Sequence, residues 1–496
     1  MPMSNRRILL VNPPLVGGIA FTRQGRCQER EEVLGTTKPP YSLALAAALL
    51  RARGVALRLV DLTAEQRSAD DLIADLRRQG FSPDLIVFPS TTPTLRADVD
   101  QMSRLKAAFA APLVCFGPHA STVPAESMAY APHVDAMIVG EPEDAIVALA
   151  AGDRPDFSSV PSVTWRRGDE IVPHRSKGTF TDFAAAPAPA WDLLPLDNYR
   201  LPLVNAPYVI VETSRGCPYA CDFCVAPIHQ GHKFRERSAS ALVDEIEWAQ
   251  RTFGVRYFYL WGDTVTLNQK TFSAFCEEII ARKLDIAWFG NARADNLTDP
   301  AFVHRLKRSG CWMLAMGIES ASPEIRKDMV KRLEEQKVRA AFANLREAGV
   351  KSFAFFIFGY PGDTPASMAN TADYAIDLDP DFANFYPAVP YPGTALYDKV
   401  RQQGLLKQDD WTRMEYSYYL LDGHGLDEPT VMKAINRAKR RFFLRPRYVV
   451  RHLGDVARLA VSKPAIVGHL LSRMLLGQQV IEPARVDEPG LAQSRS

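Results

Sequence analysis

The sequence predicts an α/β protein in which a doubly wound parallel sheet is followed by a partial (β/α)6 barrel of the TIM type and by a helical C-terminal region. The chain has 496 residues, which is more than one hydrophobic core usually supports. Short β-branched runs alternate with helical segments along most of it, and this alternation is typical of parallel βαβ units. A proline-rich stretch interrupts the alternation once. We therefore expect domains at 1–150 and 205–400, a connector at 151–204 and a C-terminal region at 401–496.

The first domain is expected to contain five strands. The strand-like runs are 7–12, 56–62, 84–88, 112–116 and 136–139. Two intervening segments have helical periodicity and end in Gly54 and Gly80, as helices commonly do. Ligands of such sheets bind beyond the carboxyl ends of the strands. Those ends are small, polar or turn-forming here: Asn12-Pro13-Pro14, Pro89-Ser90-Thr91-Thr92, Gly117-Pro118-His119 and Gly140-Glu141-Pro142-Glu143.

The connector begins with a segment, 162–174, that reads as a hairpin turning at Gly168-Asp169, and it continues into the proline-rich run 181–199. Strand-like runs then return at 208–212, 257–261, 287–290, 314–318, 352–358 and 382–387. Helical segments such as 239–254, 270–283 and 334–349 lie between them. Six βα repeats predict a full or partial barrel, in which chemistry takes place at the C-terminal ends of the strands.

The composition excludes several classes of protein. Apolar residues make up 47% and charged residues 23%, so a largely disordered chain is excluded. The formal net charge is +2, and no nucleic-acid partner is expected. Pro13 and Pro14 end the first apolar run too early for a signal peptide, and no uninterrupted apolar stretch of about 20 residues follows. We therefore expect a cytoplasmic protein.

Three of the seven cysteines, Cys217, Cys221 and Cys224, fall within eight positions directly after the first strand of the second domain. With this spacing, three thiolates can wrap one face of a small iron-sulfur cube. A cube needs four ligands, so one position stays open for an exchangeable ligand, and the amino and carboxylate groups of S-adenosylmethionine (SAM) would fit there.

A zinc ion is the alternative metal for these three thiols. A zinc ribbon needs a second ligand pair, however, and no further CxxC or HxxxH pattern occurs in the sequence. The remaining cysteines stand alone in apolar or helical contexts and are interpreted as buried or incidental thiols: Cys27, Cys115, Cys276 and Cys311.

With the aromatic Phe223 before its last cysteine, the motif resembles CxxxCxΦC, the cluster motif of the radical SAM superfamily. The resemblance extends over residues 205 to 400. It implies a 4Fe-4S cluster on the three cysteines, SAM as a cofactor, and an electron donor such as flavodoxin or ferredoxin. The later strand ends, which hold SAM in that family, match YLWGDTVTLN, GNARAD, MGIES and FGYPGDT here.

By this match, Phe223 and Asp263 belong to the SAM site, with Asp263 near the methionine amino group. Arg293 and Glu319 would meet the carboxylate and ribose region. A zwitterion that carries a ribose needs an anion, a cation and hydroxyl acceptors, so these residue types suit it. The alternative for each charged residue is an ion pair between barrel strands.

A doubly wound domain before such a barrel resembles the cobalamin-binding (B12-binding) domain of a subgroup of these enzymes. The subgroup includes methyltransferases, the anaerobic Mg-protoporphyrin ester cyclase of chlorophyll synthesis and hopanoid-modifying enzymes. The match rests on domain length, position and the turn segments GPHAST and GEPED. The motif D-x-H-x-x-G is absent, which implies a cobalt without a histidine on its lower face. The implied contacts are Ser90, Thr91 and Thr92 under the nucleotide loop, and Gly117, His119, Gly140 and Glu141 around the corrin.

Among these contacts, His119 is expected to be a hydrogen-bonding spacer rather than an axial ligand. The alternative for the whole domain is a Rossmann-like module that binds a nucleotide or nothing, although G-x-G-x-x-G does not follow the first strand.

The resemblance implies an enzyme in which reductive cleavage of SAM gives a 5'-deoxyadenosyl radical that removes hydrogen from an unactivated carbon. Methyl transfer from cobalamin is the leading expectation. Ring formation, oxidation or carbon-carbon coupling without methyl transfer is the alternative. A non-catalytic sensor of cobalamin or of a cluster is the alternative of another class, although a sensor would not need Asp263, Arg293 and Glu319.

The C-terminal region combines charge with hydrophobicity. Between Lys433 and Arg473 it carries eleven Lys or Arg and one acid, Asp455, among large apolar residues. This composition suits an interfacial helix on an anionic membrane, so we expect a small-molecule substrate that is polycyclic or a long-chain lipid, reached at the inner membrane surface. Packing of the region on the barrel, with its arginines in solvent, is the alternative.

Overall fold

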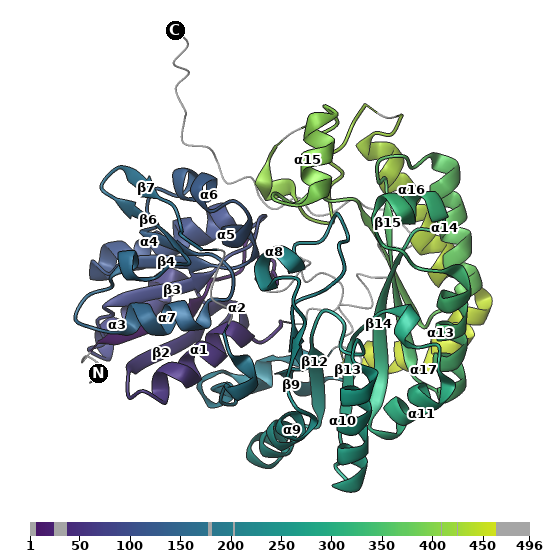
Figure 1. Ribbon diagram of the computed structural model, residues 1–496, viewed down its shortest axis with the longest axis horizontal. Helices are drawn as coiled ribbons and strands as arrows, with labels where there is room; N and C mark the ends of the chain where they lie inside the picture. Colours follow the sequence, from purple (N-terminus) through teal and green to yellow (C-terminus); the bar gives the residue numbers. More distant parts are fainter. Residues whose placement is uncertain are drawn as a thin grey trace.

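The computed structural model describes residues 6–23, 37–176, 181–201, 204–407, 409–423 and 425–462. Cys27, Lys463 and Arg473, which the sequence analysis singled out, lie outside these residues. Two α/β units lie side by side, and the chain passes from the first to the second through the connector (Figure 1).

The first unit is the doubly wound sheet that the alternation predicts. Its parallel strands follow the order β2-β1-β3-β4-β5. Their bounds are Arg7–Asn12 for β1, Ala56–Asp61 for β2, Leu85–Pro89 for β3, Leu113–Phe116 for β4 and Ala136–Ile138 for β5. The predicted hairpin is present as β6 (Val163–Arg167) and β7 (Glu170–Val172), and β6 pairs antiparallel with β5. The hairpin therefore extends the first sheet.

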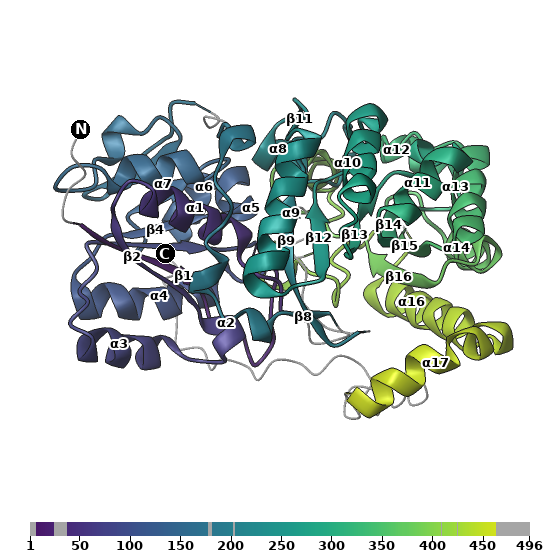
Figure 2. The ribbon, with the colours of Figure 1, turned by 90° about the horizontal axis from the view of Figure 1, so that it is seen from below.

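Helices cover both faces of this sheet. Figure 2 shows α1 (Tyr41–Arg51) and α7 (Glu143–Ala150) on one side and α3 (Ala69–Arg78) and α4 (Leu95–Phe109) on the other. Successive strand residues alternate between the two faces, so Ile8 and Leu10 join one buried cluster while Leu9 and Val11 join the other. Short helices lie near the strand ends: α2 (Leu62–Glu65), α5 (Pro118–Thr122) and α6 (Pro124–Tyr130).

The second unit is a curved, open sheet with six parallel strands, in the order β16-β15-β14-β13-β12-β9, and the short β8 (Arg200–Leu201) pairs antiparallel with β9 at one edge. Because β16 and β8 stay at opposite edges, the barrel is partial, as predicted. The parallel strands are β9 (Ala206–Glu212), β12 (Tyr257–Trp261), β13 (Ala287–Ala292), β14 (Cys311–Glu319), β15 (Lys351–Phe358) and β16 (Phe382–Pro387). The outer helices are α9 (Ala239–Phe253), α10 (Gln269–Ala281), α11 (Pro300–Arg308), α13 (Glu335–Ala348) and α14 (Pro365–Leu378).

One hydrophobic core runs through both units. Trp191 of the connector is fully buried, and the backbone N–H of Ala190 donates to the carbonyl of Ala44 in α1 at 3.0 Å. The hydroxyl of Tyr199 donates to Asp61 at the end of β2 at 2.9 Å. These buried groups belong to the same apolar cluster as the barrel strands and helices. The proline-rich connector is therefore part of the core and not a loose tether.

The C-terminal region forms α15 (Ala395–Gln402), α16 (Glu428–Phe443) and α17 (Pro446–Ser462). Helix α16 packs against α14 and β16 and buries Val431, Ile435, Ala438 and Phe442. Arg441 forms an ion pair with Asp373, and Arg445 and Arg451 form ion pairs with Asp379. This part of the basic stretch therefore packs on the barrel, which was the alternative to a fully interfacial helix. Within the described residues, no helix is both long and apolar enough to cross a membrane.

Candidate active site

The cysteine loop lies at the carboxyl edge of the barrel, immediately after β9. The strands β10 (Ser214–Arg215) and β11 (Arg235–Glu236) pair antiparallel on either side of it. Gly216 has φ +82°, and a Cβ there would lie 2.2 Å from the carbonyl oxygen of Lys233, so a residue with a side chain does not fit. Cys217 is buried, Cys221 and Cys224 are half-buried, and no disulfide joins them.

Asp222, inside the motif, ties the loop to three other elements. Its N–H donates to the carbonyl of Met329 after α12 (Pro323–Asp328) at 3.2 Å, and its carbonyl accepts the N–H of Leu396 in α15 at 2.9 Å. Its carboxylate accepts the hydroxyl of Tyr360 at 2.5 Å, and Lys399 Nζ donates to that hydroxyl at 3.3 Å. Burial raises the pKa of Asp222. Sequence reasoning missed this anchor, although an acid between two cysteines was a visible signal.

The three cysteine thiols suit a cubic iron-sulfur cluster better than a single metal ion. Across the described residues, no three His, Cys, Asp or Glu side chains converge on one point as a single metal ion requires. A cube distributes its thiolates over three different irons, so its ligands need not converge in this way. Three thiols on one short, anchored loop, two of them accessible, therefore fit a 4Fe-4S cluster.

Two of the three charged residues expected at SAM make contacts close to the cysteine loop. The buried guanidinium of Arg293, directly after β13, lies 3.8 Å from the ring centre of Tyr219 in that loop. Arg293 also donates twice to Asp295, at 3.1 Å each. Asp263 lies two residues beyond β12 and is half-buried.

Glu319 ends β14 with φ +69° and accepts Lys331 Nζ at 2.8 Å. A Cβ on Gly317 would lie 2.1 Å from Glu319 Oε1, so the glycine makes room for this pair. Lys331 Nζ in turn lies 6.0 Å from the ring centre of Phe223. Arg293 and Glu319 thus both have an ion-pair partner, but neither partner lies on another barrel strand, as the alternative interpretation required. Both residues lie beside the loop that carries the thiols.

The cobalamin candidates lie at the carboxyl edge of the first sheet. The order β2-β1-β3-β4-β5 places a topological switch point between β1 and β3, where ligands of such sheets bind. A cleft at this point is lined by Asn12, Leu43, Pro89 and Phe116, among others. Its lining combines apolar and hydrogen-bonding groups, and its volume of about 10 Å³ has room for about one water molecule.

Beside this cleft, a buried ion pair fixes the loops. Arg23 donates to Asp98 at 2.8 Å and to the carbonyl of Pro14 at 2.7 Å, and Ser90 Oγ donates to Asp98 at 2.9 Å. The sequence analysis did not identify Arg23 or Asp98. Ser90 is therefore held by protein contacts that also shape the wall of the cleft.

The other residues expected at cobalamin also contact neighbouring residues of the protein. Thr91 and Thr94 hydroxyls lie 3.0 Å apart, and His119 Nδ1 lies 3.0 Å from Thr92 Oγ1. Burial lowers the pKa of His119 to about 3, so its ring is neutral, and it packs edge-on against Trp411 with ring centres 4.4 Å apart. Gly117 φ is +124°, and a Cβ there would lie 2.4 Å from the Ser90 carbonyl oxygen. The Gly140 N–H donates to Ser121 Oγ at 3.0 Å.

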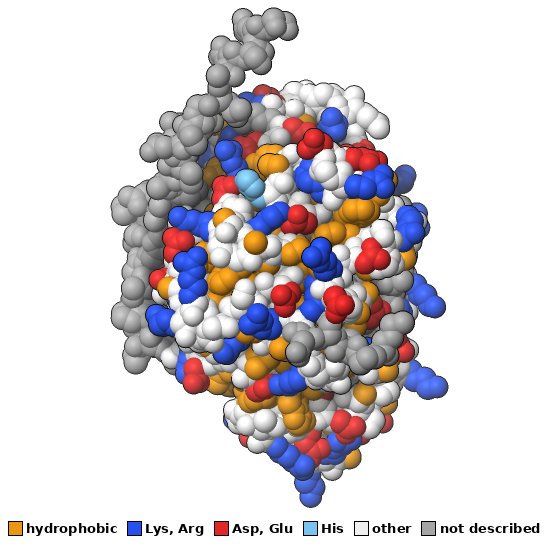
Figure 3. All heavy atoms as spheres, turned by 90° about the vertical axis from the view of Figure 1, so that its left-hand side faces the viewer, with side chains coloured by type: hydrophobic (Ala, Val, Ile, Leu, Met, Phe, Trp, Pro, Cys, Tyr) orange, Lys and Arg blue, Asp and Glu red, His pale blue; other side chains and the backbone are white. Residues whose placement is uncertain are grey.

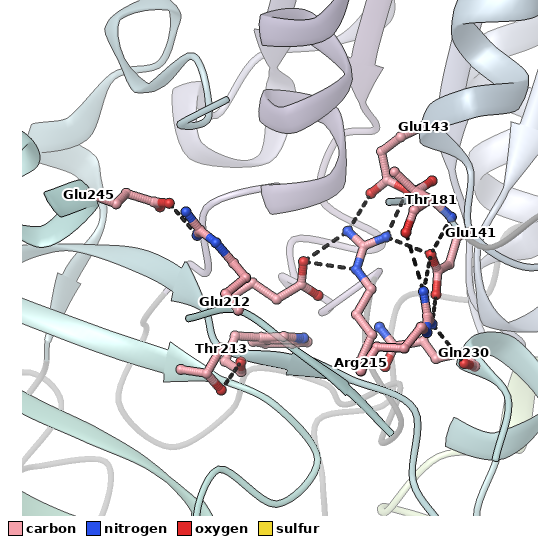
Figure 4. A network of polar contacts seen from close by, with 11 residues as sticks. Glu141, Glu143, Thr181, Glu212, Thr213, Arg215, Gln230 and Glu245 are labelled. Atoms are coloured by element: carbon pink, nitrogen blue, oxygen red, sulfur yellow. Dashed lines mark hydrogen bonds and ion pairs between the residues drawn. The ribbon is translucent and has the colours of Figure 1, made fainter. Parts of the chain in front are cut away.

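A buried ionic network joins the two units (Figure 4). Arg215, two residues before Cys217, donates to Glu141 at 2.9 Å and to Glu143 at 2.8 Å in the first unit, and forms an ion pair with Glu212 of β9 at 2.8 Å. Arg235 forms a further ion pair with Glu141. Glu141 thus binds two arginines and the Thr181 N–H, so its carboxylate holds the junction between the units, and its expected contact with a corrin ring stays a prediction.

Two arginines face three carboxylates in this network. Burial raises the pKa of Glu212 to about 7, against the opposing effect of Arg215. Sequence reasoning missed Arg215, Glu143, Glu212 and Arg235. Glu141 and Glu143 are 74 and 72 residues from Arg215, and only the pair of Glu212 with Arg215 is local. The only local signal was the position of Arg215 directly before Gly216-Cys217.

A second contact brings the two carboxyl edges together. Helix α8 (Ala226–Gln230) starts two residues after Cys224 and lies next to α5 of the first unit (Figure 1). Ser121 Oγ in α5 lies 3.0 Å from His229 Nδ1 in α8. The loops after β4 and β5 therefore face the region that carries the cysteines.

Comparison with known proteins agrees with this geometry. Residues 211–375 match the family model of the radical SAM superfamily, and residues 32–150 match that of the B12 binding domain. A protein named as an uncharacterized methyltransferase of Pyrococcus horikoshii is 27% identical over 469 residues, which cover 92% of this chain and 98% of that protein. The anaerobic magnesium-protoporphyrin IX monomethyl ester cyclase of Cereibacter sphaeroides is 26% identical over 424 residues, which cover 84% of this chain and 68% of the cyclase.

Two solved structures share the fold. The radical SAM methyltransferase TsrM of Kitasatospora setae, with cobalamin and a 4Fe-4S cluster bound, has a TM-score of 0.65 at 20% identity, over 81% of this chain and 78% of that chain. The cobalamin-dependent radical enzyme OxsB, with aqua-cobalamin and SAM bound, has a TM-score of 0.69 at 14% identity, over 95% and 75%. With a B12 binding domain joined edge to edge to a radical SAM barrel, the chain belongs to the cobalamin-dependent radical SAM enzymes.

Proposed function

We propose that the enzyme methylates an unactivated carbon of its substrate. The observation that carries this proposal is the meeting of the two carboxyl edges, through Arg215 with Glu141 and Glu143 and through Ser121 with His229. When bound, the cluster and SAM supply a hydrogen-abstracting radical and cobalamin supplies a transferable methyl group. A substrate bound between the two carboxyl edges would be within reach of both the radical and the methyl group.

The proposed reaction balances in atoms and charge. One substrate C–H, two SAM cations and two electrons give one C–CH3, 5'-deoxyadenosine, methionine and S-adenosylhomocysteine. The electrons would come from a low-potential carrier protein such as a flavodoxin or ferredoxin. No proton is released overall, because the hydrogen atom ends in 5'-deoxyadenosine.

The chain's own residues would bind and orient these groups. Cys217, Cys221 and Cys224 would hold the cluster, and Asp222 would keep their loop in place. Phe223, Asp263, Arg293 and Glu319 would contact SAM, with Arg293 and Glu319 each exchanging or sharing its present ion-pair partner. Ser90, Thr91, Thr92, Gly117, His119 and Gly140 would shape the cobalamin side. The neutral His119, packed against Trp411, would act as a spacer.

Product ratios separate this proposal from its alternatives. Anaerobic protein, reconstituted with iron, sulfide and cobalamin, would be incubated with a reductant, methyl-labelled SAM and a lipid extract. Methyl transfer requires 5'-deoxyadenosine and S-adenosylhomocysteine in equal amounts and label in a product. Ring formation, oxidation or coupling would give 5'-deoxyadenosine without S-adenosylhomocysteine, and a sensor would give neither. The Cys221→Ala variant serves as the control without a complete ligand set.

We further propose that the substrate is apolar and is reached at an anionic membrane surface through α17. Four large apolar side chains are exposed at the start of this helix: Leu444 (46%), Val449 (43%), Val450 (69%) and Leu453 (56%). The exposed Arg447 lies among them in the sequence, and a basic residue near an anionic surface adds about 1 kcal/mol of attraction. Because α16 packs on the barrel, only α17 is offered as the interfacial element.

Flotation with liposomes of rising phosphatidylglycerol content tests this contact. Binding should increase with anionic lipid, decrease with salt, and be lost in the double variant Val450→Asp, Leu453→Asp. Leu193→Asp, at a similarly exposed apolar residue of the connector (38%), should bind like the unchanged protein. If the full chain stays in the soluble fraction at low salt with strongly anionic vesicles, the membrane contact is wrong.

A further inference from the structure

The inner face of the curved sheet is lined by aromatic side chains. Strand residues alternate in direction, and one set faces the outer helices: Trp288 contacts Phe272 and Phe275 of α10, and Phe385 contacts Phe442 of α16. The alternate positions therefore face inward. They include Tyr259, Trp261, Phe289, Phe353, Phe355 and Tyr386, and all six are half-buried, unlike their fully buried outward neighbours.

These rings form two walls. On one side, Tyr259 and Phe289 stack with ring centres 4.6 Å apart and planes 6° from parallel. On the other side, Phe355 lies 4.6 Å from Phe353 and 6.0 Å from Tyr386, measured between ring centres. Tyr416, from the segment after α15, stacks on Tyr386 at 4.1 Å.

Small and neutral residues separate the two walls. The register of β13, β14 and β15 places Ala315 between Asn291 and Phe353, and it places Gly317 beside Phe355. The inward amides of Asn291 and Asn384 donate to the hydroxyls of Tyr259 and Tyr386, at 3.0 and 2.6 Å. The inward strand positions of β12 to β16 carry two charged residues in the part of the chain that the structure describes: Lys351 at the start of β15 and Glu319 at the end of β14, whose carboxylate is paired with Lys331.

Half-exposed aromatic faces on both sides of a strip of small residues suit a flat ring system. A planar conjugated ligand can stack on such faces and gain energy beyond the apolar area that it buries, whereas an aliphatic chain gains only the area. From this arrangement we infer that the substrate carries a neutral, planar, conjugated polycyclic ring system that binds against the inner face of β12 to β16. The inference rests on the proposed function, because it takes this face as the substrate side of the site.

Pyrene and its saturated counterpart hexadecahydropyrene, which have the same carbon skeleton, provide the test. Binding to the full chain would be followed by pyrene fluorescence, without lipid or detergent, and the saturated compound would be measured by competition. We expect pyrene to bind at least fivefold more tightly. Phe355→Leu should weaken pyrene binding roughly three- to tenfold and change hexadecahydropyrene binding less than twofold, since only stacking is lost.

Phe253→Leu, at a half-buried aromatic residue at the end of α9, on the outer side of the barrel, is the matched control and should bind both probes as before. Tyr386→Leu provides a second variant if Phe355→Leu unfolds. Equal affinity for both probes, or pyrene binding that neither inner variant changes, would overturn the inference. Formation of 5'-deoxyadenosine and S-adenosylhomocysteine in equal amounts from SAM by the reconstituted protein is measured in parallel. If it persists while pyrene binding fails, the substrate class is wrong and the proposed function stands; the reverse result overturns only the proposed function.

Discussion

Replacing Arg215 with methionine should destabilise the whole molecule, because it removes the central cation of the junction between the two units. The Arg215 side chain is 2% exposed, and its three partners, Glu141, Glu143 and Glu212, are each at most 2% exposed. Methionine fills much of the same volume but leaves these carboxylates without their shared cation, and breaking a buried ion pair in this way costs about 3–5 kcal/mol. Uptake of a proton by Glu212 would offset part of this cost, because burial already raises its pKa to about 7.

For a domain of this size, 1 kcal/mol corresponds to a change in Tm of about 2–4 °C, so we expect Tm to fall by roughly 10 °C. Differential scanning fluorimetry at pH 7.5 under anaerobic conditions measures this shift. Arg251→Met, which removes an exposed ion pair with Glu247 on α9, is the control and should change stability by less than about 1 kcal/mol. Arg215→Lys, which keeps the charge, should recover part of the loss. A decrease for Arg215→Met no larger than that of the control would refute the reasoning.

Three further outcomes follow from the site. Because the pKa of Glu212 is raised, its contribution to stability is present below about pH 4.5 and is lost as pH rises through about 7, so Tm should fall over this window. Glu212→Gln should flatten this dependence of Tm on pH. An unchanged slope in that variant contradicts the assignment. Cys221→Ala should lose the roughly four irons per chain expected of the anaerobic protein, by iron analysis, whereas bound zinc with unchanged iron would remove the cluster hypothesis. Tyr360→Phe removes the 2.5 Å hydrogen bond to Asp222 and should speed loss of the cluster to a chelator, while Tm falls by no more than a few degrees. Equal chelation rates for the variant and the unchanged protein would show that this hydrogen bond is not needed to hold the cysteine loop.

Much of the fold could be predicted because parallel strands are buried on both faces and therefore appear as short apolar runs. The bounds of β1, β12 and β16 coincide with the predicted ones. The strands β13 and β14 were predicted too short, since Asn291 extends β13 and Glu319 extends β14 with polar residues that apolarity does not mark, and β14 also begins three residues earlier, at Cys311. The hairpin was predicted in place, but its pairing with β5 depends on contacts between distant residues, which periodicity does not report.

The candidate site, like the fold, could be predicted only in part. The cysteines lie within one loop, so their spacing alone indicates a cluster. The ionic network could not be predicted from sequence spacing, because Arg215 and Glu141 are 74 residues apart in the sequence. Glu141 was expected at the corrin because it follows a strand end, and its ion pairs with two arginines could not be predicted from that position. The tail was harder still, since a helix that is both basic and apolar can pack on protein or on lipid, and its sequence does not say which of its apolar side chains are buried.

The core that passes through α1, the connector and the barrel also limits how such proteins could exchange parts. Lysine and arginine side chains alternate with acidic ones over the outer face of the first unit (Figure 3), so that face offers ordinary protein surface. The inner boundary is different, because Trp191 and Tyr199 are buried between the units. A chimera cut at the end of α7 would separate Glu143 from Arg215 and the connector from α1. The smallest unit that could be transplanted with this junction intact therefore runs from β1 through β11, and it includes the first strand of the second domain.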